Sequence, residues 1–448
     1  MDNLTAARTS MGVSLAFHII FAALGVGLPV LLMVAEGLGL RNRDATWYTL
    51  ARRWGKAFGV LFVVGAVSGT TLSFEFGLLW PRFMGFASAV IGLPFALEGF
   101  AFFLEAIFLG LYLYGWERLS PRAHWLCTIP LVVSGAASAW FVVTANAWMN
   151  TPAGFTAVNG TVTSVDPIAA IFNPSTPTET IHTLLACYQV TGFAVAAVYA
   201  FALLRGHNDA YHRRGLALGV LLGTVVAPIQ AIVGDASARH VAEFEPAKLA
   251  AMEALFQTTM GAPLRILGIP DPNTGQIHFS IEIPKLLSWL AFGDPNATVK
   301  GLDAFPREFW PDVITTHLAF DTMVGLGILM ILVPIWYWIV WYRRGKATPA
   351  TSTWLLRALV ALGPLSFLAL EAGWIVTERG RQPWIIHNVM LVKDGVTPVP
   401  GLGLSLLLFV GIYVALAVTT VLLLRRIGRQ PKVFTADEEH APLPAEIG

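Results

Sequence analysis

Long apolar blocks dominate this chain, and short charged or proline-containing stretches separate them. Each block could cross a lipid bilayer as a single helix, which takes about 20 residues. Nine such helices are predicted. They lie near residues 11–35, 56–79, 94–115, 126–148, 179–204, 214–233, 311–341, 352–377 and 401–424. The pattern therefore predicts an all-α polytopic membrane protein.

Lysine and arginine gather in alternate connections, those that follow spans one, three, five, seven and nine. The connection 149–178 has neither residue, and 80–93 has a single arginine. The positive-inside rule then puts the N-terminus outside and the C-terminus in the cytoplasm. The long segment 234–310 is an exception that the rule allows, because long loops cross largely regardless of charge. The other exception holds Arg379 and Arg381, whose charges we expect to be committed to a specific partner.

The predicted spans divide the chain into four parts. Residues 1–233 hold membrane helices one to six, and 311–424 hold helices seven to nine. Between them, 234–310 is the one substantial extracytoplasmic region, and it is too long to be a mere connector. The end of the chain, 425–448, is polar and contains proline, which is typical of a disordered cytoplasmic tail.

Composition supports a membrane protein and excludes several other classes. The chain is 55% hydrophobic and 13% charged, whereas soluble domains are roughly 25% charged. A net charge of +1 gives no basic surface for nucleic acid. Cys127 and Cys187 are far apart and not in a metal-ligand spacing, and no HExxH motif occurs. Disulfide, zinc and iron–sulfur interpretations are therefore unsupported.

Several ionisable side chains fall inside the predicted spans, where such residues are seldom lipid-facing. Counting depth at about 1.5 Å per residue puts six polar or sulfur-bearing side chains in the outer half of the membrane. They are His18, Glu75, Glu98, His182, Met323 and Glu371. Glu105 follows Glu98 by seven residues and shares its helical face. Similar depth predicts one shared polar or cofactor site.

The residues alone leave several interpretations open. Histidine and methionine are axial ligands of haem iron, and His317 is as plausible a ligand as Met323 on spacing. Span histidines are at least as often packing residues, and methionine usually fills a core. Glu371 could equally cap its own helix end or pair with Arg379 or Arg381. This level of reasoning reaches a membrane protein with a polar cluster, for which haem is one interpretation.

Separate motifs then point to a family. "GRQPW" follows "EAGW" (371–374), and the chain also holds "FALEGFAFFLEAIFLGLYLYGWERL" (95–119) and "KLAAME" (248–253). Together they resemble subunit I of the cytochrome bd-type quinol oxidases, over nearly the whole chain. The short loop after "KLAAME" resembles the short-loop branch, which includes cyanide-insensitive oxidases. The resemblance implies oxidation of quinol at the outer membrane face and reduction of O2 to water, generating membrane potential without pumping.

The resemblance also implies ligands and cofactors. His18 matches an axial ligand of one of two high-spin haems, and Glu371 matches the carboxylate ligand of the other. His182 and Met323 match the axial pair of a low-spin haem b. The implied cofactors are this low-spin haem b, a high-spin haem b, and a haem d or a further haem b in its place.

Further roles follow from the same resemblance. Glu98 and Glu105 match two acids beside the oxygen-reducing haem, one of them on a proton route. Lys248 and Glu253 match residues tied to quinol oxidation in the outer loop, 234–310. The remaining implied cofactor contacts are Arg8, Ser138, Asn146 and, as a partner for a haem propionate, Arg381.

Two positions depart from the family pattern. Asp321 stands where a basic residue is expected, two positions before Met323, and an acid there should lower the potential of the low-spin haem. Glu75 stands where an amide is expected and has no assigned role. The implied partners are subunit II, a small single-span subunit, quinol, O2 and membrane lipid, without nucleic acid, in the bacterial cytoplasmic membrane.

Two other functions would explain part of the pattern. A proton- or ion-coupled transporter would use Glu98, Glu105 and Glu371 as relay groups, but it leaves the His/Met pair and "KLAAME" unexplained. A haem electron carrier without oxidase activity would use the haem ligands alone. The presence of all three glutamates favours the oxidase.

Overall fold

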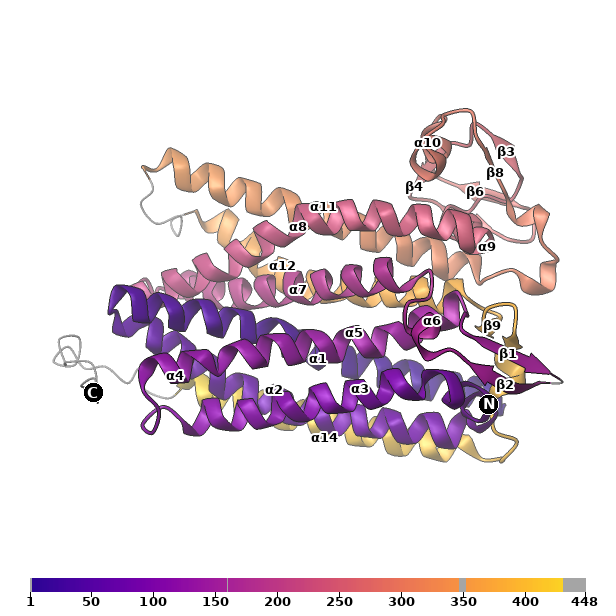
Figure 1. The fold of residues 1–448 in the computed structure, drawn as a ribbon. Coiled ribbons are helices and arrows are strands. Elements are labelled where there is room, and N and C mark those ends of the chain that lie inside the picture. Colours follow the sequence, from indigo (N-terminus) through magenta and orange to yellow (C-terminus); the bar gives the residue numbers. More distant parts are fainter. Residues whose placement is uncertain (1, 159, 346–351, 430–448) are drawn as a thin grey trace.

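The computed structural model describes residues 2–158, 160–345 and 352–429. Within these ranges, nine helical segments are long and apolar enough to cross a membrane, which confirms the predicted number. They are α1 (Asn3–Asn42), α2 (Ala45–Leu79), α3 (Pro81–Tyr114), α4 with α5 (Pro121–Leu126 and Thr128–Asn150), α7 (Thr176–Leu204), α8 (Ala210–Phe244), α11 (Val313–Arg343), α12 (Thr353–Gly380) and α14 (Leu402–Arg429). Figure 1 shows these helices running alongside one another as a bundle.

Several helices extend beyond the predicted spans. Helix α3 begins at Pro81, so much of 80–93, expected as a connection, is helical. Proline suits this first helical position because its missing N–H needs no partner there. Residues 234–244, expected in the outer loop, belong to α8. An ion pair of 2.8 Å between Asp235 and Arg239, one turn apart, supports the helix there.

The two ends of the bundle are built differently (Figure 1). One end carries the start of α1, the hairpin of β1 (Phe155–Val158) and β2 (Thr161–Val165), the short helix α6 (Pro167–Ile171), and β9 (Trp384–Ile386) with β10 (Met390–Leu391) and α13 (Val392–Gly395). It also carries residues 245–312, which we call the lobe, and we call this end the lobe end. The opposite end has short arginine-rich connections, and we call it the basic end. The predicted tail 425–448 begins inside α14, and residues 430–448 lie outside the described part of the chain.

Short strands and helices build the lobe. Its elements are α9 (Pro246–Met252), β3 (Thr259–Met260), β4 (Leu264–Ile266), β5 (Ile269–Asp271), β6 (Gln276–His278), β7 (Ile281–Ile283), α10 (Leu286–Phe292), β8 (Thr298–Val299) and the 3-10 turns Leu302–Ala304 and Arg307–Phe309. The antiparallel pairs are β3 with β8, β4 with β7 and β5 with β6. Leu249, Leu255 and Leu287 are among its buried side chains. The lobe therefore has its own small hydrophobic core.

Glycine lets α7 and α8 approach closely. A Cβ built on Gly192 would lie 2.7 Å from the backbone nitrogen of Gly223, and one on Gly219 would lie 2.7 Å from the backbone nitrogen of Ala196. Both contacts are with backbone, so a side chain could not be accommodated by a rotamer change. Helices in lipid associate through close packing of such small residues. The crossing fixes α7, which carries His182.

Candidate functional site

A cavity of about 1110 Å³ lies within the bundle, walled mainly by α1, α2, α3, α5 and α12. It exceeds the roughly 300–1,000 Å³ of pockets that hold drug-sized molecules. Eight residues to which the family resemblance assigns a site role line it: Arg8, His18, Glu98, Glu105, Ser138, Asn146, Glu371 and Arg381. Most of the remaining wall is apolar.

His18 projects from α1 with one ring nitrogen already bonded. Its Nδ1 lies 2.9 Å from Oγ of Ser68 on α2. That hydroxyl donates its own proton to the carbonyl of Gly65 at 3.0 Å, so it accepts the proton of Nδ1–H. The ring is then the tautomer with a free Nε2 lone pair, the form that binds metals. Gly69 leaves room for the ring, because a Cβ there would lie 3.0 Å from Cε1 of the histidine.

Glu371 on α12 has a buried Oε1 without a protein partner in the described chain. The two arginines that were considered as ion-pair partners of Glu371 pair with other carboxylates. Arg379 pairs with Asp312, and Arg381 pairs with Glu378 at 2.6 Å. Local pairing of Glu371 is thus contradicted, and so is capping, because α12 continues to Gly380. A carboxylate left without a partner on a cavity wall is available to a ligand.

The two acids of α3, Glu98 and Glu105, line the same cavity. Ser138 donates a hydrogen bond of 3.1 Å to Oε1 of Glu98. Glu105 is buried, and its Oε1 has no partner in the described residues. A Cβ on Gly135 would lie 3.2 Å from that oxygen, so this glycine keeps space beside the carboxylate.

Sequence reasoning missed Glu378, which also lines the cavity. It accepts hydrogen bonds from the Asn146 amide and from Nη2 of Arg381. It follows Glu371 by seven residues, the interval that also separates Glu98 from Glu105 and keeps side chains on one helical face. That spacing could have identified it.

Charge is distributed unevenly along the cavity. Arg8 near the start of α1 lies within electrostatic reach of Arg379, and Arg381 follows the end of α12. These three arginines line the cavity toward the lobe end. Glu98 and Glu105 lie farther along α3, toward the basic end. The cavity therefore offers guanidinium groups at one end and carboxyl groups deeper inside.

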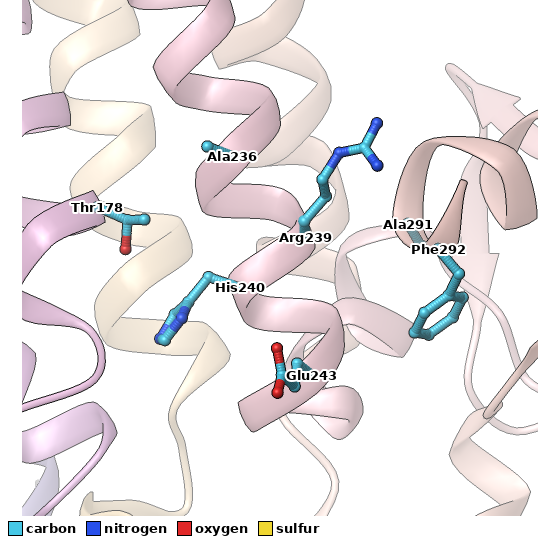
Figure 2. A pocket seen from close by; sticks show the side chains of 7 residues that line it. All are labelled: Thr178, Ala236, Arg239, His240, Glu243, Ala291 and Phe292. Carbon is cyan, nitrogen blue, oxygen red and sulfur yellow. The ribbon is translucent and has the colours of Figure 1, made fainter.

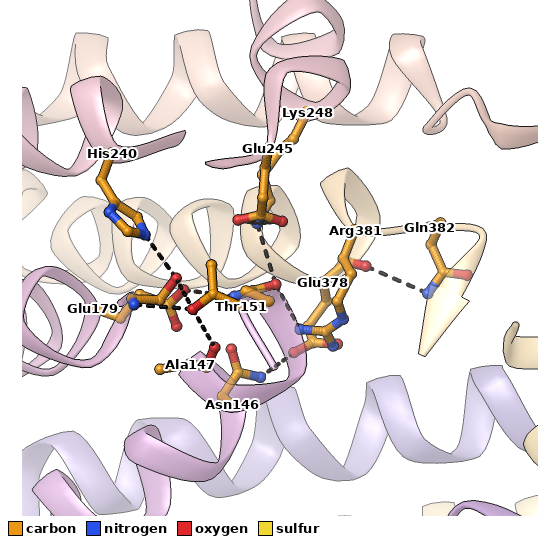
Figure 3. A network of polar contacts seen from close by, with 12 residues as sticks. Asn146, Ala147, Thr151, Glu179, His240, Glu245, Lys248, Glu378, Arg381 and Gln382 are labelled. Carbon is orange, nitrogen blue, oxygen red and sulfur yellow. Dashed lines mark hydrogen bonds and ion pairs between the residues drawn. The ribbon is translucent and has the colours of Figure 1, made fainter. Parts of the chain in front are cut away.

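The lobe meets the cavity wall through a buried polar network around Asn150, which we call the Asn150 network. Figure 3 labels Glu179, Lys248 and Arg381, which contact Asn150. Nζ of Lys248 lies 3.3 Å from Oδ1 of Asn150, and Nη1 of Arg381 lies 2.9 Å from the same oxygen. The Asn150 amide donates to Glu179 at 2.6 Å. Lys248 also forms an ion pair of 3.0 Å with Glu245. The network links α5, α7 and α9 to the turn after α12.

Two of the sequence motifs meet at this network. A Cβ on Gly380, the glycine of "GRQPW", would lie 2.8 Å from Cγ of Lys248, the lysine of "KLAAME". Because Gly380 has no Cβ, the aliphatic part of the Lys248 side chain has room to pass it and reach Asn150. Motifs separated by more than a hundred residues in sequence thus form one contact.

Glu253 at the end of α9 faces different surroundings from Lys248. It is buried, and its Oε2 has no partner within the described residues. Burial raises the pKa of Glu253 to about 8, with Asp321 adding to the rise and Arg265 opposing it. His317 is also buried close by, with Nδ1 2.7 Å from the carbonyl of Met252 and Nε2 3.6 Å from Oδ2 of Asp321.

Three residues predicted to share the main site lie apart from the cavity. Glu75 is buried against α1, where Ser14 donates to its Oε1 at 2.5 Å. His182 faces α8, with Nε2 3.2 Å from Nε2 of Gln230. Sδ of Met323 lies against α12, 3.1 Å from where a Cβ of Gly373 would be. None of the three lines the cavity, so the expectation of one shared site is wrong.

A second, smaller hollow of about 540 Å³ lies between α7, α8 and α10 (Figure 2). Its lining includes Arg239, His240, Glu243 and Phe292, but neither Lys248 nor Glu253. His240 turns from this hollow toward α7, where its Nε2 contacts Oγ of Ser175 at 2.8 Å.

Comparison with known proteins agrees with this arrangement. The sequence model of the family described as cytochrome bd terminal oxidase subunit I matches residues 6–432. The chain belongs to this family. A cytochrome bd menaquinol oxidase subunit I of Bacillus subtilis is 40% identical over 428 residues, covering 95% of this chain and 96% of the relative. The cytochrome bd ubiquinol oxidase subunit 1 of the same organism is 32% identical, covering 99% and 97%.

The fold also matches a solved member of the family. The bd oxidase from Geobacillus thermodenitrificans superposes with a TM-score of 0.91 at 39% identity, covering 96% of this chain and 98% of that chain. This subunit I is therefore part of a terminal quinol oxidase, a multi-pass membrane enzyme that transfers electrons from quinol to oxygen. Membership implies haem cofactors, and the transporter alternative has no support.

Proposed function

We propose that the cavity holds the two high-spin haems, with His18 as the ligand of one iron and Glu371 as the ligand of the other. The carrying observation is a pair of open ligand atoms on residues that line one cavity: the free Nε2 of His18 and the unpartnered Oε1 of Glu371. Bound haem iron supplies the redox centre for oxygen reduction. One of the two sites takes haem d or a further haem b.

The other groups of the cavity suit such cofactors. Arg8, Arg379 and Arg381 line its lobe end, and arginine forks match carboxylates such as haem propionates. Nε of Arg381 is buried and unpartnered in the described chain, so it has a donor to spare. Ser138 and Asn146 orient Glu98 and Glu378. Glu98 and Glu105 are the groups that hold and pass protons toward the reacting oxygen.

His182 of α7 and Met323 of α11 would hold the iron of a low-spin haem b. His182 Nδ1 and Gln230 Oε1 are buried polar atoms without a partner among the described residues. Such orphaned atoms are costly in a membrane interior, and a bound cofactor with its waters would satisfy them. Gln230 must then leave Nε2 of His182.

Quinol is oxidised at the lobe end, with Lys248 and Glu253 as its polar contacts. Glu253 receives a quinol proton, and Lys248 holds the Asn150 network against the cavity. The lobe end faces the outside of a bacterial cytoplasmic membrane and the basic end faces the cytoplasm, in line with the positive-inside rule. Subunit II and a small single-span subunit complete the assembly.

Pigment analysis of two variants tests this assignment. His18→Ala and Glu371→Gln should each lose one high-spin haem from the reduced-minus-oxidised spectrum while low-spin bands remain. Extraction of the pigments identifies haem d or haem b at the oxygen site. A Glu371→Gln oxidase with the full complement of high-spin haem would overturn the ligand role of that residue.

A further inference from the structure

A separate buried acid–histidine pair lies near the basic end. It joins Glu36, near the end of α1, to His124 in α4, and both side chains are at most 3% exposed. Nδ1 of His124 lies 2.7 Å from Oε1 of Glu36. Nε2 of the same ring lies 2.8 Å from the backbone carbonyl of Tyr112 on α3. The pair is apart from the cavity and none of the roles above uses it.

These contacts require a proton between the two side chains. A carbonyl oxygen only accepts, so Nε2 of His124 carries a proton. The contact between Nδ1 and Oε1 must then also hold a proton, because two lone pairs at hydrogen-bond distance would repel each other. The proton belongs either to an imidazolium beside a carboxylate or to a carboxyl group beside a neutral imidazole. In both forms the pair is neutral overall and holds one transferable proton.

The surroundings fix the ring but leave polar atoms open. The His124 ring packs between Tyr112 and Trp116, with centroids 4.6 and 4.1 Å away. Oε2 of Glu36 and the hydroxyls of Tyr48 and Tyr112 are buried without a hydrogen-bond partner in the described chain. Among the described residues, the titratable side chains that face Glu36 from neighbouring elements include His124, Tyr48, Tyr112 and Cys127. Orphaned polar atoms clustered in this way are suitable contacts for water.

Helix α3 connects this pair to the cavity. Glu98, Glu105 and Tyr112 follow one another at intervals of seven residues, which places all three on one face. Each interval spans about 10 Å along the helix. Tyr112 touches the pair through its carbonyl, and Glu105 lines the cavity. This face of α3 thus runs from the Glu36–His124 pair near the basic end to the cavity, where oxygen reduction would consume protons.

We infer that Glu36 and His124 form the first buried proton-relay station for oxygen reduction, feeding Glu105 along the Tyr112 face of α3. This inference rests on the proposed function, in which protons reach the cavity from the basic end and Glu105 passes them on. Reduction of one O2 to two waters takes four electrons, supplied by quinol, and four protons. For each proton, the bond that holds it in the pair breaks, and hydrogen-bonded water molecules pass a proton along Tyr112 to the Glu105 carboxylate. A proton from the aqueous phase at the basic end then reloads the pair.

The alternative is that the pair only fastens α4 to α1 and α3. Glu36→Gln and His124→Gln separate the two roles, because each amide can keep one of the pair's hydrogen bonds but cannot release a proton. Tyr112→Phe keeps the carbonyl contact and removes only the orphaned hydroxyl. His212→Gln is a matched control, since His212 contacts Asp209 at 2.8 Å at the same end of the bundle, on α8.

The experiment uses the complete purified oxidase, fully reduced and mixed rapidly with oxygen. Haem absorbance follows oxidation, and a pH-indicator dye follows proton uptake. We expect Glu36→Gln and His124→Gln to slow proton uptake by about tenfold or more, as for the loss of a positioned proton-transfer group, with unchanged haem spectra. His212→Gln should match the unaltered oxidase.

Glu105→Gln in the same assay separates the two levels of the proposal. If it slows uptake while Glu36→Gln and His124→Gln do not, the relay pair is wrong and the cavity role of Glu105 stands. If Glu105→Gln also leaves uptake unchanged, the proposed proton route through Glu105 is itself wrong. Should Glu36→Gln lose its haems, His124→Gln and Tyr112→Phe decide: normal uptake in both overturns the relay.

Discussion

Replacing Glu253 with glutamine should abolish a pH dependence of the quinol oxidation rate that comes from the titration of Glu253. Burial, with help from Asp321, raises the pKa of Glu253 to about 8. The carboxylate that would receive a quinol proton is then present in about one tenth of molecules at pH 7, half at pH 8 and nine tenths at pH 9. Turnover limited by this group should rise about fivefold from pH 7 to 8 and less than twofold from pH 8 to 9.

Oxygen uptake with saturating quinol, measured from pH 6 to 9, gives this profile directly. Glu253→Gln should be slow and nearly flat across the range. Glu282→Gln is the matched control, because Glu282 is half-exposed and pairs with the same Arg265 at 2.9 Å; it should keep the rise. A flat profile in the unaltered oxidase, or an unchanged rise in Glu253→Gln, would refute the role of this carboxyl.

The raised pKa of Glu253 also predicts an effect on stability with a definite sign. The folded protein keeps the Glu253 proton up to a pKa of about 8, whereas the usual value is 4.5. Between these values the unfolded chain binds fewer protons than the folded one, so stability falls as pH rises. Thermal unfolding of the oxidase should therefore show a smaller loss between pH 6 and 9 in Glu253→Gln.

The remaining predictions concern the low-spin site, the lobe contact and the helix crossing. Met323→Leu should convert a low-spin haem signal to high-spin in the visible spectrum; an unchanged spectrum would move the ligand role to His317. Lys248→Ala should slow quinol-driven oxygen uptake by about tenfold and keep the haem content, whereas full activity would remove it from the quinol site. Gly219→Val should cost about 1–3 kcal/mol by overpacking and reduce the yield of haem-loaded oxidase, while Gly110→Ala, with open space around its Cβ, should not.

The number of membrane helices was predictable because every span must supply a long apolar run. The helix ends were not, because a helix can continue once it leaves the apolar layer. In α8 the Asp235–Arg239 pair supports the continuation to Phe244. Hydropathy reports the burial of a segment in lipid, whereas local hydrogen bonds and charges decide where the helix stops.

The residues of the cavity were largely predictable, but their grouping was not. Depth counting gives a position along the membrane normal and says nothing of the direction in which a side chain points. Glu75 and His182 share the depth of His18 yet face other helices. Glu378 was missed because the predicted span ended at 377, although its spacing from Glu371 marks the same face.

The roles of Lys248 and Glu253 show a different limit. Both stand in "KLAAME", five residues apart, and the family resemblance links both to quinol. In the structure one reaches the Asn150 network and the other the Asp321 side of the lobe. Their closeness in sequence could not show that the short helix α9 directs the two side chains to different surroundings.

One amide oxygen, Oδ1 of Asn150, accepts hydrogen bonds from two cationic side chains. Nζ of Lys248 and Nη1 of Arg381 share it, so the two charges are no more than about 6 Å apart and repel by roughly 3 kcal/mol at an effective dielectric constant of 20. Lys248 belongs to the lobe, and Arg381 lines the cavity. A change of charge at the lobe therefore alters the electrostatic potential of the cavity directly, without movement of a helix. The midpoint potential of a cofactor in the cavity should accordingly respond to the charge state of the lobe.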